Sequence, residues 1–276
     1  MIHTEIRGAF VFATLASPGT RNALNEGMVA ELLEAIARSE ALPEVRALVV
    51  RGGSGHFCAG GDFSRFRDLM ATPAPQAGVD PIATFNRAFG SLLERLQGAT
   101  VVTIAVVEGA AMGGGVGLAA CCDFVLAGSS SRVGIPEVTL GLPPAQIAPF
   151  VAARLGEGPA RRLMLTGRRL QAEEALACGL ADEVVDDAAM DLRLNALLTD
   201  LGRAEPAALR ATKAILQHRR SASLPDTLDF AASHFAASLR SGTASEGLAA
   251  LSGKRTARWV VQAPAANIPA DDGPTP

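Results

Sequence analysis

Short apolar runs alternate with segments of helical spacing through the first two thirds of the chain. Apolar residues three and four apart, such as Met28, Leu32 and Ile36, predict a helix that ends near Ser39. Another helix is predicted over 82–96, and a small-residue helix up to Ala120. Continuous apolar runs predict buried strands at 10–15, 47–50, 101–107 and 124–127. This alternation predicts a layered α/β domain with parallel strand pairing.

The pattern changes after about residue 188. Helical spacing continues with no strand signal, at 192–201, 207–217, 224–239 and 243–251. Helices of this kind usually cap a domain or bind a second copy of it. We therefore divide the chain into an α/β core domain (1–187), a helical C-terminal region (188–262) and a loose tail rich in Pro, Ala and Asp (263–276). Three prolines and a glycine at 72–81 predict a mobile surface loop.

Composition and charge exclude several classes of protein. With 49% hydrophobic and 19% charged residues among 276, the chain is neither disordered nor fibrous. A net charge of −3 offers no basic field for nucleic acid, and the apolar runs are too short to span a membrane. The first residues lack the apolar core of a signal peptide. Four cysteines do not form a disulfide framework, so we expect reduced thiols and a cytoplasmic location: Cys58, Cys121, Cys122 and Cys178.

Three familiar motifs are absent. A dinucleotide fingerprint from Gly113 would need glycine at 118, where Leu118 stands. The chain has no P-loop lysine and no G-x-S-x-G nucleophile motif. Its four histidines lack metal-ligand spacing, so no metal is expected.

Two glycine-rich segments, 57–62 and 113–115, each follow a predicted strand and precede a predicted helix. Backbone N–H groups at such turns point outward near the positive end of a helix. Two such turns that converge would bind an oxygen on which negative charge develops. The alternative is two tight turns that merely require glycine.

Glu137 is an isolated carboxylate in the otherwise apolar segment 133–144. Burial there would raise its pKa, which suits proton transfer. An ordinary surface or ion-paired glutamate is the alternative interpretation.

The order and spacing of these segments resemble the crotonase (enoyl-CoA hydratase/isomerase) superfamily over roughly residues 5 to 260. The supporting segments are 21–25 (RNALN), 57–62 (FCAGGD), Gly109 with 113–115, 122–123 (CD), 136–141 (PEVTLG), 165–167 (LTG), and 246–247 (EG) with 254–255 (KR). The resemblance implies the crotonase (ClpP/crotonase-like) spiral of ββα units, with a helical C-terminal region that forms a homotrimer or a dimer of trimers.

The resemblance also implies a site. Family members bind acyl-CoA, so coenzyme A is part of the substrate and no separate cofactor is implied. The N–H groups of Gly61 and Gly114 would hold the thioester oxygen, and Glu137 would carry the proton chemistry. Further positions that would bind substrate or CoA are Arg21, Ala23, Ala59, Asp62, Gly113 and, from a neighbouring subunit, Lys254. Arg21 and Lys254 can equally be plain surface cations.

The chain departs from the family pattern at two positions. Hydratases that use two glutamates carry one of them where Gly117 stands here, so the two-carboxylate mechanism cannot be transferred. Glu108 replaces an asparagine found in many relatives, and we interpret it as a structural hydrogen-bonding residue rather than a spare acid.

The segment 136–151 most resembles the branch that hydrates 3-branched glutaconyl-CoA esters, with isohexenylglutaconyl-CoA of acyclic terpene breakdown favoured. Alternatives are a 3-methylglutaconyl-CoA hydratase of leucine breakdown and a general enoyl-CoA hydratase or isomerase. A non-catalytic acyl-CoA-binding or RNA-binding protein is a different class, and the acidic pI and absence of tyrosine argue against RNA. Candidate partners for a substrate carboxylate are Arg65, Arg67, Arg87 and Gln146.

Overall fold

The main sheet has six strands, in the order β1-β2-β3-β4-β6-β9. The structure, a computed structural model, describes residues 1–71, 73, 75 and 78–264. All neighbouring strands pair in parallel except β1, which is antiparallel to β2. The strands are β1 (Ile2–Arg7), β2 (Phe10–Leu15), β3 (Ala47–Gly52), β4 (Val102–Val107), β6 (Phe124–Gly128) and β9 (Glu183–Val185).

The central strands are apolar throughout because both faces of the sheet are covered. Along β2, Val11 and Ala13 belong to one hydrophobic core, whereas Phe10 and Phe12 belong to a second core on the opposite face. Successive side chains of a strand point to opposite faces, so a strand buried on both sides needs an unbroken apolar run. The same reasoning accounts for β3 and β4.

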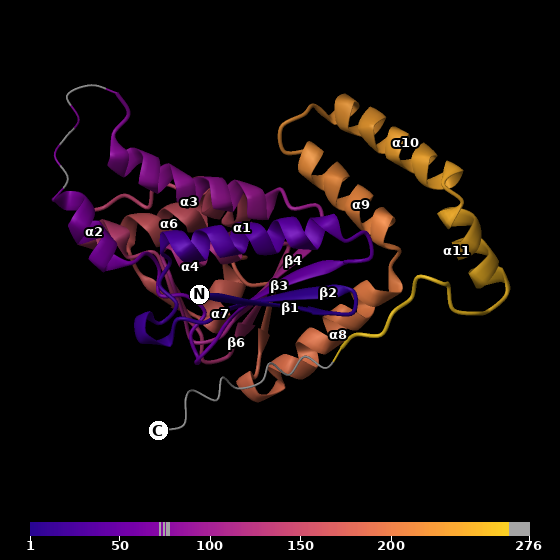
Figure 1. Cartoon of the computed structure of the whole chain (residues 1–276), viewed down its shortest axis with the longest axis horizontal. Coiled ribbons are helices and arrows are strands. Elements are labelled where there is room, and N and C mark those ends of the chain that lie inside the picture. Colours follow the sequence, from indigo (N-terminus) through magenta and orange to yellow (C-terminus); the bar gives the residue numbers. More distant parts are fainter. Residues whose placement is uncertain (72, 74, 76–77, 265–276) are drawn as a thin grey trace.

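Helices that lie along the sequence between the strands cover the first face of the sheet. Asn25 caps the first of them, and its side chain accepts a hydrogen bond from the Met28 N–H at 2.9 Å. Figure 1 shows the first of these helices, α1 (Glu26–Ala41), along one side of the sheet. The others are α3 (Pro81–Gln97), α4 (Gly114–Cys121), α5 (Ala148–Leu155), α6 (Glu157–Thr166) and α7 (Ala172–Ala177). The short helix α2 (Phe63–Met70) follows the Gly61 turn.

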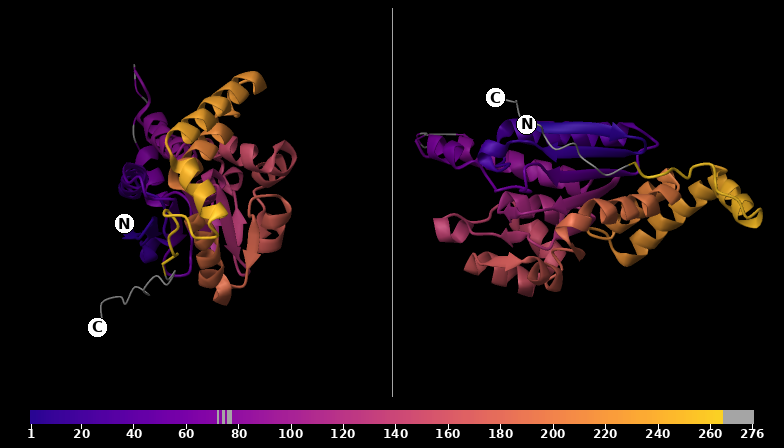
Figure 2. Two further views of the ribbon diagram at one scale, coloured as in Figure 1. Left: turned by 90° about the vertical axis from the view of Figure 1, so that its right-hand side faces the viewer. Right: turned by 90° about the horizontal axis from the view of Figure 1, so that it is seen from below.

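The described chain ends in four helices, α8 (Met190–Arg203), α9 (Pro206–His218), α10 (Leu224–Arg240) and α11 (Thr243–Ser252). α8 packs on the second face of the sheet. Lys213 of α9 reaches the sheet, where its ammonium donates to the Val101 carbonyl at 2.7 Å and to the Asp123 carboxylate at 2.6 Å. α10 and α11 project beyond the sheet at one end of the molecule (Figures 1 and 2).

The layered α/β architecture is confirmed, but the predicted parallel pairing does not describe every strand. It missed the antiparallel edge strand β1 and a second sheet of three strands in the order β5-β7-β8. These are β5 (Ala110–Met112), β7 (Arg132–Gly134) and β8 (Arg169–Gln171), each only three residues long and therefore too short to leave a periodic signal. The division into a core domain and a helical region stays a prediction. Most of the predicted tail, and four residues of the predicted loop at 72–81, lie outside the described residues.

Candidate active site

The two glycine-rich turns lie side by side because the segments that lead into them pair as short strands. The Cys58 N–H donates to the Ala110 carbonyl at 3.0 Å, and the Met112 N–H donates to the Cys58 carbonyl at 2.9 Å. This pairing brings the turn at Gly60 against the turn before α4. A Cβ atom at Gly60, whose φ is +100°, would lie 3.0 Å from the Met112 carbonyl oxygen and 3.9 Å from the Gly114 nitrogen. Glycine at this position therefore permits the close approach.

Gly61 and Gly114 each present a backbone amide at this junction. Leu24 pairs with the Gly61 strand by donating to the Gly60 carbonyl at 2.7 Å and accepting from the Asp62 N–H at 3.1 Å. That pattern leaves the Gly61 N–H facing away from Leu24. Within the described residues, neither this amide nor the Gly114 amide has a hydrogen-bond partner. Gly114 is the first residue of α4, so its N–H also lies at the positive end of a helix. Two such amides can bind an oxygen that gains negative charge.

Glu137 opens a short 3₁₀ turn, Glu137–Leu140, and directs its carboxylate at the same junction. A Cβ atom at Gly113 would lie only 2.3 Å from Glu137 Oε1, so a larger residue would displace the carboxylate. Glu137 Oε2 is buried and has no hydrogen-bond partner. Burial raises the pKa of the Glu137 carboxyl above its ordinary value of 4.5. In the described parts of the chain Glu137 has no ion pair, which excludes the interpretation of an ion-paired glutamate there.

Comparison with known proteins identifies the family. A model described as enoyl-CoA hydratase/isomerase matches residues 5–262.

The chain belongs to the enoyl-CoA hydratase/isomerase family. It is 31% identical to the 2,3-dehydroadipyl-CoA hydratase of Escherichia coli, over 88% of this chain and 92% of the relative. A solved enoyl-CoA hydratase/isomerase from Marinobacter aquaeolei is 39% identical, with a TM-score of 0.90 over 94% of this chain and 99% of that chain. Pseudomonas aeruginosa AtuE is 43% identical, with a TM-score of 0.89 over the same shares. The protein is therefore a hydro-lyase of the enoyl-CoA hydratase type, which acts on an acyl-CoA.

Gly117 stands at the position of the family's second glutamate, and apolar side chains fill the space beside it. Gly117 lies in the buried first half of α4. A Cβ atom there would lie 2.4 Å from Ile147 Cγ2 and 3.5 Å from Leu93 Cδ1. The other departure, Glu108, accepts two hydrogen bonds from the Arg51 guanidinium, at 2.6 and 2.9 Å. Glu108 is thus engaged in a structural ion pair.

Four of the predicted substrate-binding positions lie beside the two turns: Arg21 and Ala23, which precede α1, and Ala59 and Asp62, which precede α2. The Ala59 N–H donates to the Arg21 carbonyl at 3.0 Å, which holds Arg21 and Ala23 next to the 57–62 segment. The Arg21 side chain is exposed. Asp62 caps α2, accepting from the Ser64 N–H at 2.9 Å and the Ser64 hydroxyl at 2.6 Å. These hydrogen bonds lower the pKa of the Asp62 carboxyl.

Lys254 is not brought to this site. It follows α11, which lies at the opposite end of the molecule from α2 (Figure 1), and it is exposed. Within one chain, Lys254 therefore has no route to a ligand bound at the two turns.

Two of the arginines proposed for a substrate carboxylate already have anionic partners. Arg65 pairs with Glu26 at 2.9 Å and Arg87 with Glu94 at 2.7 Å. Arg67 is exposed on α2. Gln146 is half-buried and donates a hydrogen bond from Nε2 to Asn86 Oδ1 at 2.8 Å. Asn86 was not predicted as a site residue, because a polar residue on an amphipathic helix ordinarily lies on the solvent-exposed face.

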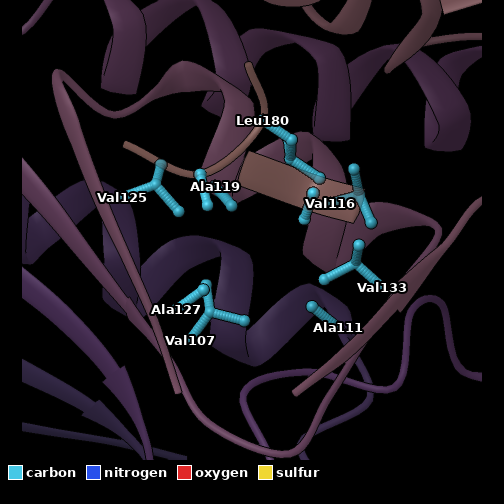
Figure 3. Close-up of a pocket in the computed structure, with 10 residues that line it drawn as sticks. Val107, Ala111, Val116, Ala119, Val125, Ala127, Val133 and Leu180 are labelled. Atoms are coloured by element: carbon cyan, nitrogen blue, oxygen red, sulfur yellow. The ribbon is translucent and has the colours of Figure 1, made fainter. Parts of the chain in front are cut away.

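A separate small cavity lies on the other side of α4, between that helix and the strands (Figure 3). Only Val, Ala and Leu side chains line it, including Val116 and Ala119 of α4. With no polar group to orient a thioester, this cavity belongs to the packed core.

In the described parts of the chain, no cluster of three His, Cys, Asp or Glu side chains could hold a metal ion. Over the same residues, no helix is both long enough and apolar enough to cross a membrane.

Proposed function

We propose that the enzyme adds water across the α,β double bond of a 3-branched glutaconyl-CoA ester, with isohexenylglutaconyl-CoA as the favoured substrate. The observation that carries the hydratase chemistry is the single unpartnered carboxylate of Glu137 beside the free amides of Gly61 and Gly114. The choice of acyl group rests on the likeness of the segment 136–151 to that branch of the family.

In this proposal the two amides bind the thioester oxygen. Ionised Glu137 takes a proton from water while the water oxygen bonds to Cβ of the substrate. The π electrons move through Cα onto the thioester oxygen, giving an enolate that both amides stabilise. Protonated Glu137 then delivers that proton to Cα, which restores the thioester carbonyl and the carboxylate. The raised pKa favours the first step, because it makes the ionised carboxylate a stronger base toward water.

One carboxylate thus performs both proton transfers, and Gly117 adds no second one. No cofactor takes part, because coenzyme A belongs to the substrate. Arg21 would contact the CoA phosphates, since its exposed side chain leaves the loop beside the 57–62 segment. Lys254 would do so only from a neighbouring subunit.

Two observations favour a dicarboxylic acyl group over a simple enoyl group. The half-buried amides of Gln146 and Asn86 meet beside α3, whose Phe89 lies against Gly114. The name of one relative, 2,3-dehydroadipyl-CoA hydratase, also refers to the thioester of a dicarboxylic acid.

A panel of enoyl-CoA substrates tests this proposal. Loss of the enoyl-thioester absorbance is followed for isohexenylglutaconyl-CoA, 3-methylglutaconyl-CoA and 3-methylcrotonyl-CoA, which lacks the distal carboxylate. We expect kcat/KM to be about 10- to 100-fold higher for the glutaconyl esters, since hydrogen bonds to a charged group contribute roughly 1.5–3 kcal/mol.

Each contrary result selects one alternative. A higher kcat/KM for 3-methylglutaconyl-CoA than for the isohexenyl ester would select the leucine-breakdown substrate. Equal values with and without the carboxylate would indicate a general enoyl-CoA hydratase. Binding without turnover would indicate an acyl-CoA-binding protein.

We further propose that the chain assembles as a homotrimer, or as a dimer of trimers, through its last helices. Large apolar side chains are exposed on α9 to α11, with Leu228 60% and Phe235 68% exposed. A monomer seldom exposes so many together. They are Leu216, Leu224, Leu228, Phe235, Leu239, Leu248 and Leu251.

Light scattering at micromolar concentration is expected to give three or six times the chain mass of 28.4 kDa. The double variant Leu228→Glu/Phe235→Glu should reduce that mass, because it places charges in the apolar face. Leu165→Glu/Leu176→Glu, an equal charge change at exposed leucines on α6 and α7, should not. A monomeric wild type would contradict the proposal.

A further inference from the structure

Two side-chain amides meet where α3 passes the turn before α5. Gln146 Nε2 donates to Asn86 Oδ1 at 2.8 Å, and both side chains are half-buried. The two residues are 60 positions apart in the chain, so only the fold brings them together.

The backbone of α3 is shaped to admit this pair. A Cβ atom at Gly90 would lie 1.9 Å from Gln146 Oε1, so any other residue there would collide with the amide. Backbone conformation does not explain a glycine at position 90, since this residue lies inside a 17-residue helix and is not left-handed. Glycine inside a helix costs about 1 kcal/mol relative to alanine. Space for Gln146 offers a reason for that cost.

The pair lies next to the proposed reaction centre. Phe89, one turn after Asn86 on α3, lies against Gly114, where a Cβ atom would be 3.2 Å from the ring. On the Gln146 side, the next residue, Ile147, packs against Gly117 of α4. The amide pair is therefore adjacent to Phe89 and Ile147, the two residues that contact the first turn of α4.

The pair keeps donors available after its internal hydrogen bond. A primary amide has two N–H donors, so Asn86 retains both and Gln146 retains one. Within the described residues, no acceptor takes a hydrogen bond from Asn86 Nδ2. The Arg87 guanidinium lies beside the pair, since a Cβ atom at Gly90 would be 3.0 Å from Arg87 Nη1. Free amide donors suit an anionic oxygen, and Arg87 itself is already paired with Glu94.

We propose that Asn86 and Gln146 form the specificity-determining subsite that binds the distal carboxylate of the acyl group. This inference rests on the proposed hydration of a glutaconyl-CoA ester and names the residues that recognise its second acid group. The arginines nearby are engaged with glutamates, so the amides, rather than a direct ion pair, supply the hydrogen bonds.

The variant Gln146→Glu tests the subsite, because it preserves size and places a negative charge where the carboxylate binds. With 3-methylglutaconyl-CoA we expect kcat/KM to fall at least tenfold, mainly through KM. With 3-methylcrotonyl-CoA it should change less than about twofold, since that substrate has no carboxylate to repel. Gln97→Glu is the matched control: it makes the same change at a half-buried glutamine at the end of α3, away from the amide pair, and should affect neither substrate.

Binding of saturated analogues separates this inference from the hydration proposal. Calorimetry should show that wild type binds 3-methylglutaryl-CoA more tightly than isovaleryl-CoA, and that Gln146→Glu removes the preference. This holds even if no enoyl-CoA is turned over, in which case the hydration proposal alone fails. If Gln146→Glu does not fold, Asn86→Ala replaces it, with the same loss of preference expected. No preference in wild type, or an equal loss for both ligands in the variant, would overturn the subsite.

Discussion

Replacement of Glu137 by glutamine is expected to lower kcat by about 10²- to 10⁴-fold, while the affinity for acyl-CoA changes little. Glutamine has nearly the same shape, so it keeps the packing against Gly113 but cannot accept the proton from water. Stopped-flow turnover and calorimetric binding of a saturated acyl-CoA measure the two quantities separately. Near-normal turnover would remove Glu137 from the mechanism.

Wild type and Glu137→Gln should also differ in how their activity and their stability depend on pH. Because burial raises the Glu137 pKa, wild-type activity should decline with falling pH while the medium is still above the ordinary value of 4.5. In the folded protein the ionised carboxylate is less favourable than in the unfolded chain. Its destabilising effect therefore sets in as pH rises through 4.5 and is complete above the raised pKa. Glu137→Gln lacks that effect, so its Tm at pH 7 should equal or exceed that of wild type.

Glu108→Gln is the matched control for these measurements. The Arg51 guanidinium pairs with Glu108 and with Asp191. Loss of the Glu108 charge leaves the half-buried guanidinium with Asp191 as its remaining anionic partner. We expect Glu108→Gln to lower Tm and to leave kcat almost unchanged, the reverse of Glu137→Gln. If both variants lost activity to the same extent, the assignment of proton transfer to Glu137 alone would be wrong.

The sequence predicts the central strands well because burial on both faces leaves a simple signature. The expected strand at 10–15 coincides with β2, and the one at 101–107 begins one residue before β4. β1 escaped prediction because an edge strand is only partly buried, and its sequence IHTEIR is mostly polar. The three-residue strands of the second sheet are held by pairing with distant segments, which no local pattern reveals.

Part of the candidate site could likewise be predicted from the sequence and part could not. Gly61, Gly114 and Glu137 could be singled out only because the order and spacing of their segments together resemble a known family; taken singly, each segment left an ordinary structural interpretation open. The partners of a substrate carboxylate could not be identified this way. Arg65 follows the glycine turn closely and Arg87 stands on the next long helix, but the sequence does not reveal that each pairs with a glutamate. The amide pair joins residues 60 positions apart, and its signal is the unexplained Gly90 inside α3.

A single substitution at Gly117 is not expected to restore the two-glutamate mechanism, because apolar side chains fill the space beside this glycine. We expect Gly117→Glu to destabilise the protein by several kcal/mol, measured as a lower urea midpoint, and not to raise hydratase activity. Overpacking against Ile147 contributes about 1–3 kcal/mol. The new carboxylate would also be buried between Ile147 and Leu93 without a partner, which costs several kcal/mol more.

Gly117→Ala separates the steric effect from that of the charge. Alanine favours a helix by about 1 kcal/mol over glycine, but its Cβ still meets Ile147 Cγ2 at 2.4 Å unless Ile147 moves. We therefore expect a modest net destabilisation for Gly117→Ala and a much larger one for Gly117→Glu. Equal midpoints for the two variants would show that the carboxylate reaches solvent or a partner.

A double-mutant cycle with Ile147→Ala locates the clash. Ile147→Ala alone removes a buried side chain and should cost about 2–5 kcal/mol. In the Gly117→Glu background the same change opens room for the new side chain, so the double variant should be more stable than the sum of the single effects predicts. Activity above wild type in Gly117→Glu, at an unchanged urea midpoint, would show that the site accepts a second carboxylate. The expected outcome instead is that Ile147 and Leu93, packed over a glycine, confine the proton chemistry to Glu137.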